Sequence, residues 1–75
     1  MKRIYLKTSA SGSRNLVVEQ HQFDANGIST DTKRGIRAVD PNKADQALEF
    51  ATQNPDKFSF GDAIGQGFYE VIYTP

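Results

Sequence analysis

The stretch VDPNKADQALEFATQNP, residues 39–55, ends one predicted strand and contains the single helix that the sequence predicts. Asp40 can cap the helix with its carboxylate, and Pro41 suits the first helical position because its missing N–H would have no partner there. A proline at 55 ends the helix, since the residue before proline avoids helical geometry. We therefore expect a helix over about residues 41–54. Its apolar stripe follows the spacing i, i+3, i+4, i+7 at Ala44, Ala47, Leu48 and Ala51.

Three strands are predicted ahead of this helix, over residues 3–8, 15–23 and 28–39. Each shows the two-residue alternation of a half-buried strand. The tetrapeptide DANG, residues 24–27, predicts a tight hairpin between the second and third strands, because Asn-Gly tolerates the positive φ angles of such turns. The third strand is long, and Gly35 within it indicates a bulge or bend.

After the helix, residues 58–67 read as a loop that folds back over one end of the core, and residues 68–74 read as the last strand. The glycines of GDAIGQG lead into a strand, not a helix, and no lysine accompanies them, so we interpret them as turn residues and not as a phosphate loop. The predicted fold is α+β in the order βββαβ, a four-stranded sheet with one helix packed on one face. A right-handed crossover would place the last strand beside the first and parallel to it, with the first two strands in the middle, although the sequence leaves the antiparallel alternative open.

The chain of 75 residues predicts one domain spanning residues 1–75. It has no cysteine and no apolar stretch of about 18 residues, so we expect a cytoplasmic protein without a membrane partner. Residues 1–37 carry seven Lys or Arg against three Asp or Glu, whereas residues 38–75 carry two against six. This asymmetry indicates one basic and one acidic half.

The residues that could carry out catalysis are few. His21 is the only histidine, and Glu19 lies two positions away on the same side of the predicted strand. A metal site needs three or four converging donors, and catalysis needs a nucleophile or a second acid, yet no recognisable spacing supplies them. A solvent-facing histidine is therefore favoured over a catalytic one. We expect no metal, no cofactor and no enzymatic activity.

The sheet face turned away from the helix is the main candidate for binding. If Ile36 and Ala38 of the third strand face the helix together with the apolar rows of the first two strands, cations and aromatic residues gather on the opposite face. That face could be merely solvated, could anchor another protein, or could stack single-stranded nucleic acid. The candidate binding residues there are Tyr5, Lys7, His21, Phe23, Lys33 and Arg37. A second candidate surface is the acidic side of the helix, with Asp45 and Glu49.

The predicted meander from residue 1, followed by Arg37-Ala38-Val39-Asp40 leading into an alanine-rich helix through Ala44 and Ala47, resembles the layout of several small phage-encoded anti-CRISPR proteins. The resemblance covers about residues 1–54. It implies a protein without enzymatic machinery that occupies a surface of a CRISPR effector complex or its nuclease. No binding residue follows from the resemblance.

These observations predict a small, non-enzymatic inhibitor that binds a larger protein or ribonucleoprotein complex, in the host cell cytoplasm if the chain is phage-encoded. The alternative is a module that binds single-stranded nucleic acid on the open sheet face. The sequence leaves open whether the chain is a monomer or a homodimer, and whether the basic sheet face or the acidic helix face makes the contact.

Overall fold

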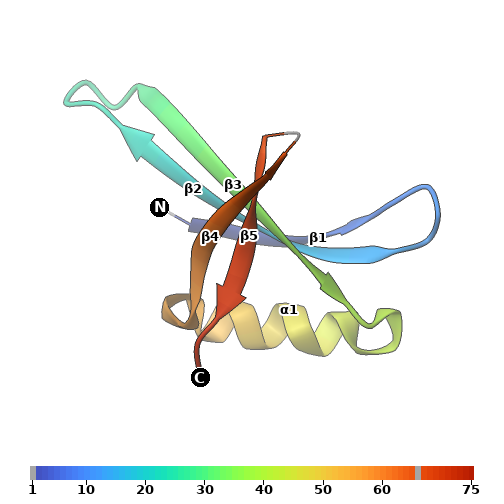
Figure 1. Ribbon diagram of the computed structural model, residues 1–75. Coiled ribbons are helices and arrows are strands. Elements are labelled where there is room, and N and C mark those ends of the chain that lie inside the picture. Colours follow the sequence, from blue (N-terminus) through green and yellow to red (C-terminus); the bar gives the residue numbers. More distant parts are fainter. Residues whose placement is uncertain (1, 66) are drawn as a thin grey trace.

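The computed structural model describes residues 2–65 and 67–75 and shows a mixed five-stranded sheet with one α-helix (Figure 1). The α+β class and the single helix were predicted and are confirmed. The strands are β1 (Lys2–Thr8), β2 (Arg14–Phe23), β3 (Ser29–Val39), β4 (Phe58–Gly65) and β5 (Phe68–Tyr73). The helix α1 spans Ala44–Gln53, between the short 3-10 turns Pro41–Lys43 and Pro55–Lys57. The strands lie in the order β1-β2-β3-β5-β4.

The first three strands form the predicted antiparallel meander. The predicted tight turn between β2 and β3 is present, with Gly27 at a φ of 78°. The Asp24 carboxylate accepts the backbone N–H groups of Asn26 and Ile28 at 2.9 and 3.0 Å, which closes the turn. The same chemistry starts the helical segment, where the Asp40 carboxylate accepts the N–H of Asn42 at 2.9 Å.

The predicted four-stranded sheet in the order βββαβ is wrong, because the structure has five strands in the order βββαββ. Most of residues 58–67, predicted as a covering loop, forms the additional strand β4. β4 pairs antiparallel with β5 through a turn in which Gly65 and Gly67 have φ angles of 89° and 79°, as turn glycines do. Its register shifts on both sides of Ala63, so the side chains do not keep a two-residue period. That irregularity hides the strand from pattern reading, and residue 66 lies outside the described part of the chain.

The predicted strand order is also wrong. β5 lies beside β3 and runs parallel to it, with Arg34 opposite Phe68 and Ile36 opposite Glu70. β3 is therefore central, and β1 and β4 are the two edges. The chain passes from α1 through the 3-10 turn Pro55–Lys57 into β4 and returns as β5 between β4 and β3, which buries Val71 in the core.

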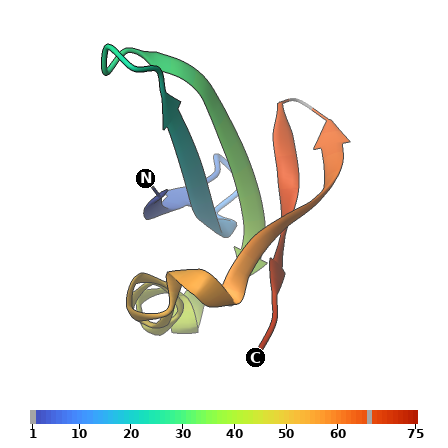
Figure 2. The ribbon, with the colours of Figure 1, turned by 90° about the vertical axis from the view of Figure 1, so that its left-hand side faces the viewer.

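The helix covers only part of the sheet. α1 packs against β1 and β2, and Figure 2 shows it on one side of the strands while the β2–β3 and β4–β5 hairpins extend away from it. We call the side turned toward α1 the helix face; its residues include Ile4, Leu6, Leu16, Val18, Gly35, Arg37, Phe60, Tyr69, Val71 and Tyr73. The buried cluster that joins helix and sheet consists of Leu16, Val18, Ala51, Phe58 and Val71. Fully burying a side chain of the size of Leu16 stabilises the fold by about 1.5 to 3 kcal/mol.

Of the two alternatives predicted for Gly35, a bulge or a bend, the bulge is not present. The register of β2 with β3 is regular at Gly35 and shifts instead between Gln22 and Phe23. Gly35 is needed because a Cβ there would lie 2.5 Å from Cγ2 of Val71 and 2.8 Å from Cε1 of Phe60. The missing side chain lets β5 and the Phe60 ring pack directly onto β3.

No helix in the described part of the chain has the length and hydropathy that a membrane crossing requires.

The substitution Gly35→Ala should lower the free energy of unfolding by about 1 to 3 kcal/mol, because the added methyl group overpacks the contact with Val71 and Phe60. Urea denaturation monitored by circular dichroism measures this change. The control Ala38→Val adds volume at an exposed position of the same strand and should change stability by less than about 0.5 kcal/mol. Equal effects of the two substitutions would contradict the proposed close approach of β5 to β3.

Candidate binding surface

The sheet side opposite the helix is built around the middle of β2. Val17 and Glu19 point to this side, between their partners Tyr5 and Arg3 on β1 and Ile36 and Arg34 on β3. We call this side the open face; its residues are Arg3, Tyr5, Lys7, Val17, Glu19, His21, Phe23, Thr32, Arg34, Ile36, Phe68 and Glu70. No α-helix packs against the open face in the described structure.

Glu19 is the centre of a polar cluster on the open face. Its residue is only 5% exposed, which is exceptional for a carboxylate on a sheet surface. The Tyr5 hydroxyl and Nε of Arg34 each donate to Oε2 at 3.0 Å. On the other oxygen, Oε1, Nε2 of His21 lies at 3.1 Å and Nη1 of Arg3 at 3.9 Å. Both carboxylate oxygens are thus engaged by side chains from all three strands of the meander.

These contacts change the acidity of two groups. Burial raises the pKa of Glu19, but the hydrogen bonds from Arg34, Tyr5 and His21 outweigh it, so the pKa is lowered from its ordinary value of 4.5. Burial, and then the hydrogen bond to Glu19, raises the pKa of the Tyr5 hydroxyl above 10.0. At neutral pH, Glu19 is therefore ionised and Tyr5 is protonated, and the hydrogen bond between them persists.

The arrangement has a clear chemical consequence. An ionised carboxylate with a lowered pKa is a poor proton donor, and engagement of both oxygens leaves it badly placed as a general base. The cluster instead holds Arg34 and Tyr5 in fixed positions on the sheet. Within residues 2–65 and 67–75, no group of three or more His, Asp or Glu side chains is arranged to hold a metal ion.

His21 links this cluster to the end of the hairpin. Its Nδ1 lies 3.2 Å from the Thr32 hydroxyl, while Nε2 faces Glu19. Its ring stacks on Phe23 with the ring centroids 6.5 Å apart. The imidazole is therefore held from three directions and continues the ordered surface from Glu19 to Phe23.

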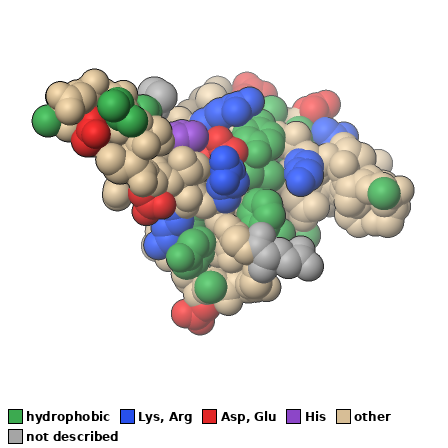
Figure 3. Space-filling view, turned by 90° about the horizontal axis from the view of Figure 1, so that it is seen from above, with side chains coloured by type: hydrophobic (Ala, Val, Ile, Leu, Met, Phe, Trp, Pro, Cys, Tyr) green, Lys and Arg blue, Asp and Glu red, His purple; other side chains and the backbone are tan. Residues whose placement is uncertain are grey.

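Cations lie beside aromatic rings on the open face. The Arg3 guanidinium lies 4.8 Å from the centre of the Tyr5 ring, and Nζ of Lys7 lies 5.9 Å from that of Phe68. Figure 3 shows blue cationic groups on either side of red carboxylate atoms on this side of the molecule, with the purple histidine next to them. A hollow of about 190 Å³ on this side is lined by residues from β1, β2, β3, β5 and the loop after β1: Lys7, Ser9, Asn15, Ile36 and Phe68.

The β2–β3 hairpin projects beyond the helix (Figure 1). It carries exposed apolar side chains. Phe23 is 50% exposed and Ile28 is 63% exposed. The Asp24 carboxylate and the backbone bonds between Asp24, Gly27 and Ile28 fix the turn that separates them. The hairpin end therefore presents apolar groups on an ordered backbone.

The structure places the predicted sheet-face residues on two different sides. Tyr5, Lys7, His21 and Phe23 belong to the open face, as expected. Lys33 and Arg37 do not: their pairing with Gln20 and Leu16 puts them on the helix face, and the expectation that Ile36 and Ala38 meet the helix is wrong in the same way. The physical reason is that α1 does not extend over β3, so an apolar residue of β3 need not face the helix.

On the helix face, Lys33 and Arg37 lie among the aromatic residues of the C-terminal hairpin. Nζ of Lys33 lies 4.3 Å from the centre of the Tyr69 ring and 5.3 Å from that of Phe60. The acidic candidates Asp45 and Glu49 are both exposed on α1, and Glu49 accepts a hydrogen bond from Gln53 at 3.4 Å. They lie apart from the Glu19 cluster.

The sequence analysis did not include Arg3, Arg34 or Phe68 among the candidate binding residues, although the alternation of the first strand places Arg3 on the same side as Tyr5. One signal could have found Arg34. A two-residue turn at Asn26 and Gly27 would place Arg34 opposite Glu19. The structure has this pairing, but reaches it through the register shift between Gln22 and Phe23. No comparable signal pointed to Phe68, because its position depends on the insertion of β5 beside β3.

No protein-family model, curated protein or solved structure matches this chain.

Glu19→Gln should lower the free energy of unfolding by about 1 to 3 kcal/mol at pH 7, because it removes the charge that receives the bonds from Arg34 and Tyr5. The contribution of ionised Glu19 to the free energy of unfolding also depends on pH. Since the folded pKa of Glu19 is below its unfolded value, the stabilisation is fully present above about pH 4.5 and is lost as the pH falls through the folded pKa.

Urea unfolding between pH 7 and pH 3 measures this effect. The stability difference between the wild type and Glu19→Gln should shrink as the pH falls below 4.5. The control Glu49→Gln removes a carboxylate from the exposed helix surface and should leave the pH profile close to that of the wild type. A difference that stays constant down to pH 3 would show that Glu19 is not held as a carboxylate.

Proposed function

We propose that this chain is a small, non-enzymatic binding protein that inhibits a larger protein assembly by occupying part of its surface. The single observation that carries the proposal is the ordered hairpin end, which presents Phe23 and Ile28 to solvent beside the His21 and Glu19 cluster. Exposed apolar groups on a rigid support bind with a small loss of conformational freedom.

The open face supplies the surroundings that such an anchor needs. Aromatic and arginine side chains are enriched in protein interfaces, and Arg3, Tyr5 and Arg34 lie along the same side as His21. Glu19 fixes two of these side chains through hydrogen bonds, so the polar part of the surface is arranged before binding. The Phe23 ring would enter an apolar pocket of the partner, and the cations would meet acidic groups around it.

The partner class follows from the resemblance in layout to small phage-encoded anti-CRISPR proteins. On this proposal the chain acts in the host cytoplasm on a CRISPR effector complex or its nuclease. In the Glu19 cluster, both carboxylate oxygens are engaged by neighbouring side chains. This arrangement supports inhibition by covering a surface of the partner over inhibition by enzymatic modification of the partner. Purified effector complexes are the first candidates to test.

The experiment compares the wild type with Phe23→Ser, each immobilised and exposed first to purified effector complexes and then to a nuclease-treated bacterial lysate. Removing an apolar anchor of this kind costs about 2 kcal/mol, so Phe23→Ser should bind the partner at least about tenfold more weakly. The matched control is Ile64→Ser, which removes a similarly exposed apolar side chain from the other hairpin.

The proposal predicts that the wild type and Ile64→Ser retain the partner and that Phe23→Ser does not. Equal retention by all three proteins would exclude the hairpin end as the contact. A retained effector whose DNA binding and cleavage are unchanged would contradict inhibition while leaving binding intact.

A second candidate function is binding of single-stranded nucleic acid. The observation that favours it is the hollow where Lys7 lies beside the Phe68 ring, since a base can stack on an aromatic ring while a cation neutralises its phosphate. A labelled oligothymidylate or oligouridylate tests this function. An affinity for the oligonucleotide that falls steeply with added salt, and that is lower in Lys7→Ala, would favour nucleic acid as the ligand. This conclusion also requires that the immobilised chain retains no protein.

A further inference from the structure

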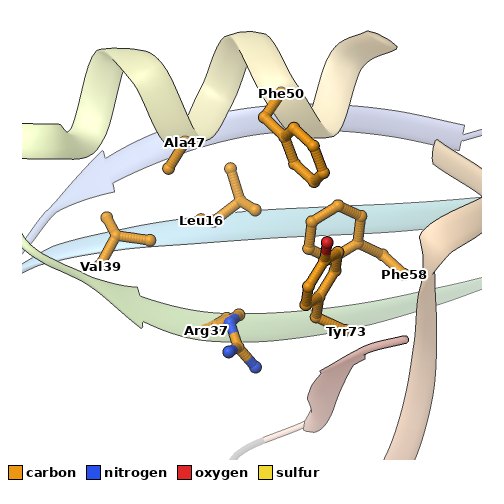
Figure 4. A pocket seen from close by; sticks show the side chains of 7 residues that line it. All are labelled: Leu16, Arg37, Val39, Ala47, Phe50, Phe58 and Tyr73. Atoms are coloured by element: carbon orange, nitrogen blue, oxygen red, sulfur yellow. The ribbon is translucent and has the colours of Figure 1, made fainter. Parts of the chain in front are cut away.

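A pocket of about 250 Å³ lies on the helix face, beside the edge of α1 where the helix stops covering the sheet (Figure 4). Its lining comes from β2, β3, α1, β4 and β5, so segments from most of the chain meet there. The lining residues are Leu16, Arg37, Val39, Ala47, Phe50, Phe58 and Tyr73. The pocket is on the opposite side of the sheet from the open face, so it does not depend on the function proposed above.

Three aromatic rings form one wall of the pocket. The Phe50 and Tyr73 centroids are 5.6 Å apart at 72°, and those of Phe58 and Tyr73 are 5.3 Å apart at 39°. Figure 4 shows these rings on one side of the space and the aliphatic side chains of Leu16, Val39 and Ala47 on the other. Because Ala47 carries only a methyl group, the helix leaves the space between the two walls unfilled.

Arg37 gives this apolar pocket a positive charge. Its Nη1 donates to the backbone carbonyl of Val71 at 3.3 Å, which fixes the guanidinium next to β5. Figure 4 shows the nitrogen end directed away from the helix, at the margin of the pocket. None of the ion pairs found within residues 2–65 and 67–75 involves Arg37. Its remaining N–H groups are therefore available to an anion.

We propose that this pocket binds a small carboxylic acid with a flat apolar body, such as an aryl carboxylate. The body would lie between the three rings and the aliphatic wall, and the carboxylate would pair with Arg37 at the margin. The size fits, since a closed apolar cavity of about 150 Å³ accepts benzene, and this pocket has room for a ring with a short acid chain. Guanidinium is the cation best suited to a carboxylate because it offers paired N–H donors.

Phenylacetate is the probe, and its neutral analogue 2-phenylethanol has the same ring and a similar length. Titration of the ¹⁵N-labelled protein, followed by amide chemical shifts, measures the dissociation constant and locates the site. The shift changes caused by phenylacetate should saturate with a Kd on the order of 1 mM, as expected for a ligand of this size. The largest shifts should fall on Arg37, Ala47, Phe50 and Tyr73, and 2-phenylethanol should bind about fivefold or more weakly.

Two variants test separately whether ligand affinity depends on the charge of Arg37 and on the free volume of the pocket. Arg37→Gln should weaken phenylacetate binding to the level of 2-phenylethanol and leave the affinity for the alcohol unchanged. The control Lys43→Gln removes an exposed cation outside the pocket lining and should change the affinity for neither compound. Ala47→Leu should fill the space and weaken both compounds. Amide spectra of each variant without ligand verify that it is folded.

Three outcomes would overturn the proposal. They are the absence of saturable shifts at the pocket, equal affinity for the acid and the alcohol, and an unchanged acid affinity in Arg37→Gln. An acetylated Gly-Gly-Phe peptide with a free carboxyl end provides a further comparison. Binding of this peptide without binding of phenylacetate would make the pocket a docking site for chain termini and would exclude a small-molecule site.

Discussion

β2 is buried on both of its faces, and this constraint organises the rest of the molecule. Leu16 and Val18 lie beneath α1 on one side, and Val17 and Glu19 are covered on the other. A carboxylate can be buried at such a position only if donors replace the water it loses. β1 and β3 supply these donors, Tyr5 and Arg34, so the alignment of all three strands is tied to the charge of one side chain.

The two sides of the sheet therefore have different physical characters. The open face is polar and ordered around an ionised carboxylate, and it leads to exposed apolar groups at the hairpin end. The helix face is apolar and aromatic, but α1 is too short to cover it, which leaves a pocket with Arg37 at its margin. On the two proposals above, the open face would contact a macromolecular partner and the pocket on the helix face would bind a small anion.

Sequence patterns predicted the elements that are locally determined. The DANG turn, the Asp40 cap and the alternation in β1 and β2 depend on neighbouring residues, and the structure contains all of them. The sequence patterns gave wrong predictions for the elements whose position depends on packing between distant parts of the chain. β4 has an irregular register, β5 enters the sheet beside β3 because of space left by Gly35, and the face of each β3 residue depends on pairing with β2. Of the six candidate residues predicted for one sheet face, Tyr5, Lys7, His21 and Phe23 share the open face, while Lys33 and Arg37 lie on the helix face.

Glu19 is held as a carboxylate by its neighbours on β1, β2 and β3, and these contacts order the open face. The most direct test of this arrangement is a ¹³C NMR titration of the Glu19 side-chain carboxyl group in the folded protein, with Glu49 followed in the same spectra. The midpoint for Glu19 should lie below the ordinary value of 4.5, with a coincident shift in the Tyr5 and Arg34 side-chain resonances. A midpoint at or above 4.5, or a titration that leaves Tyr5 and Arg34 unaffected, would contradict this arrangement.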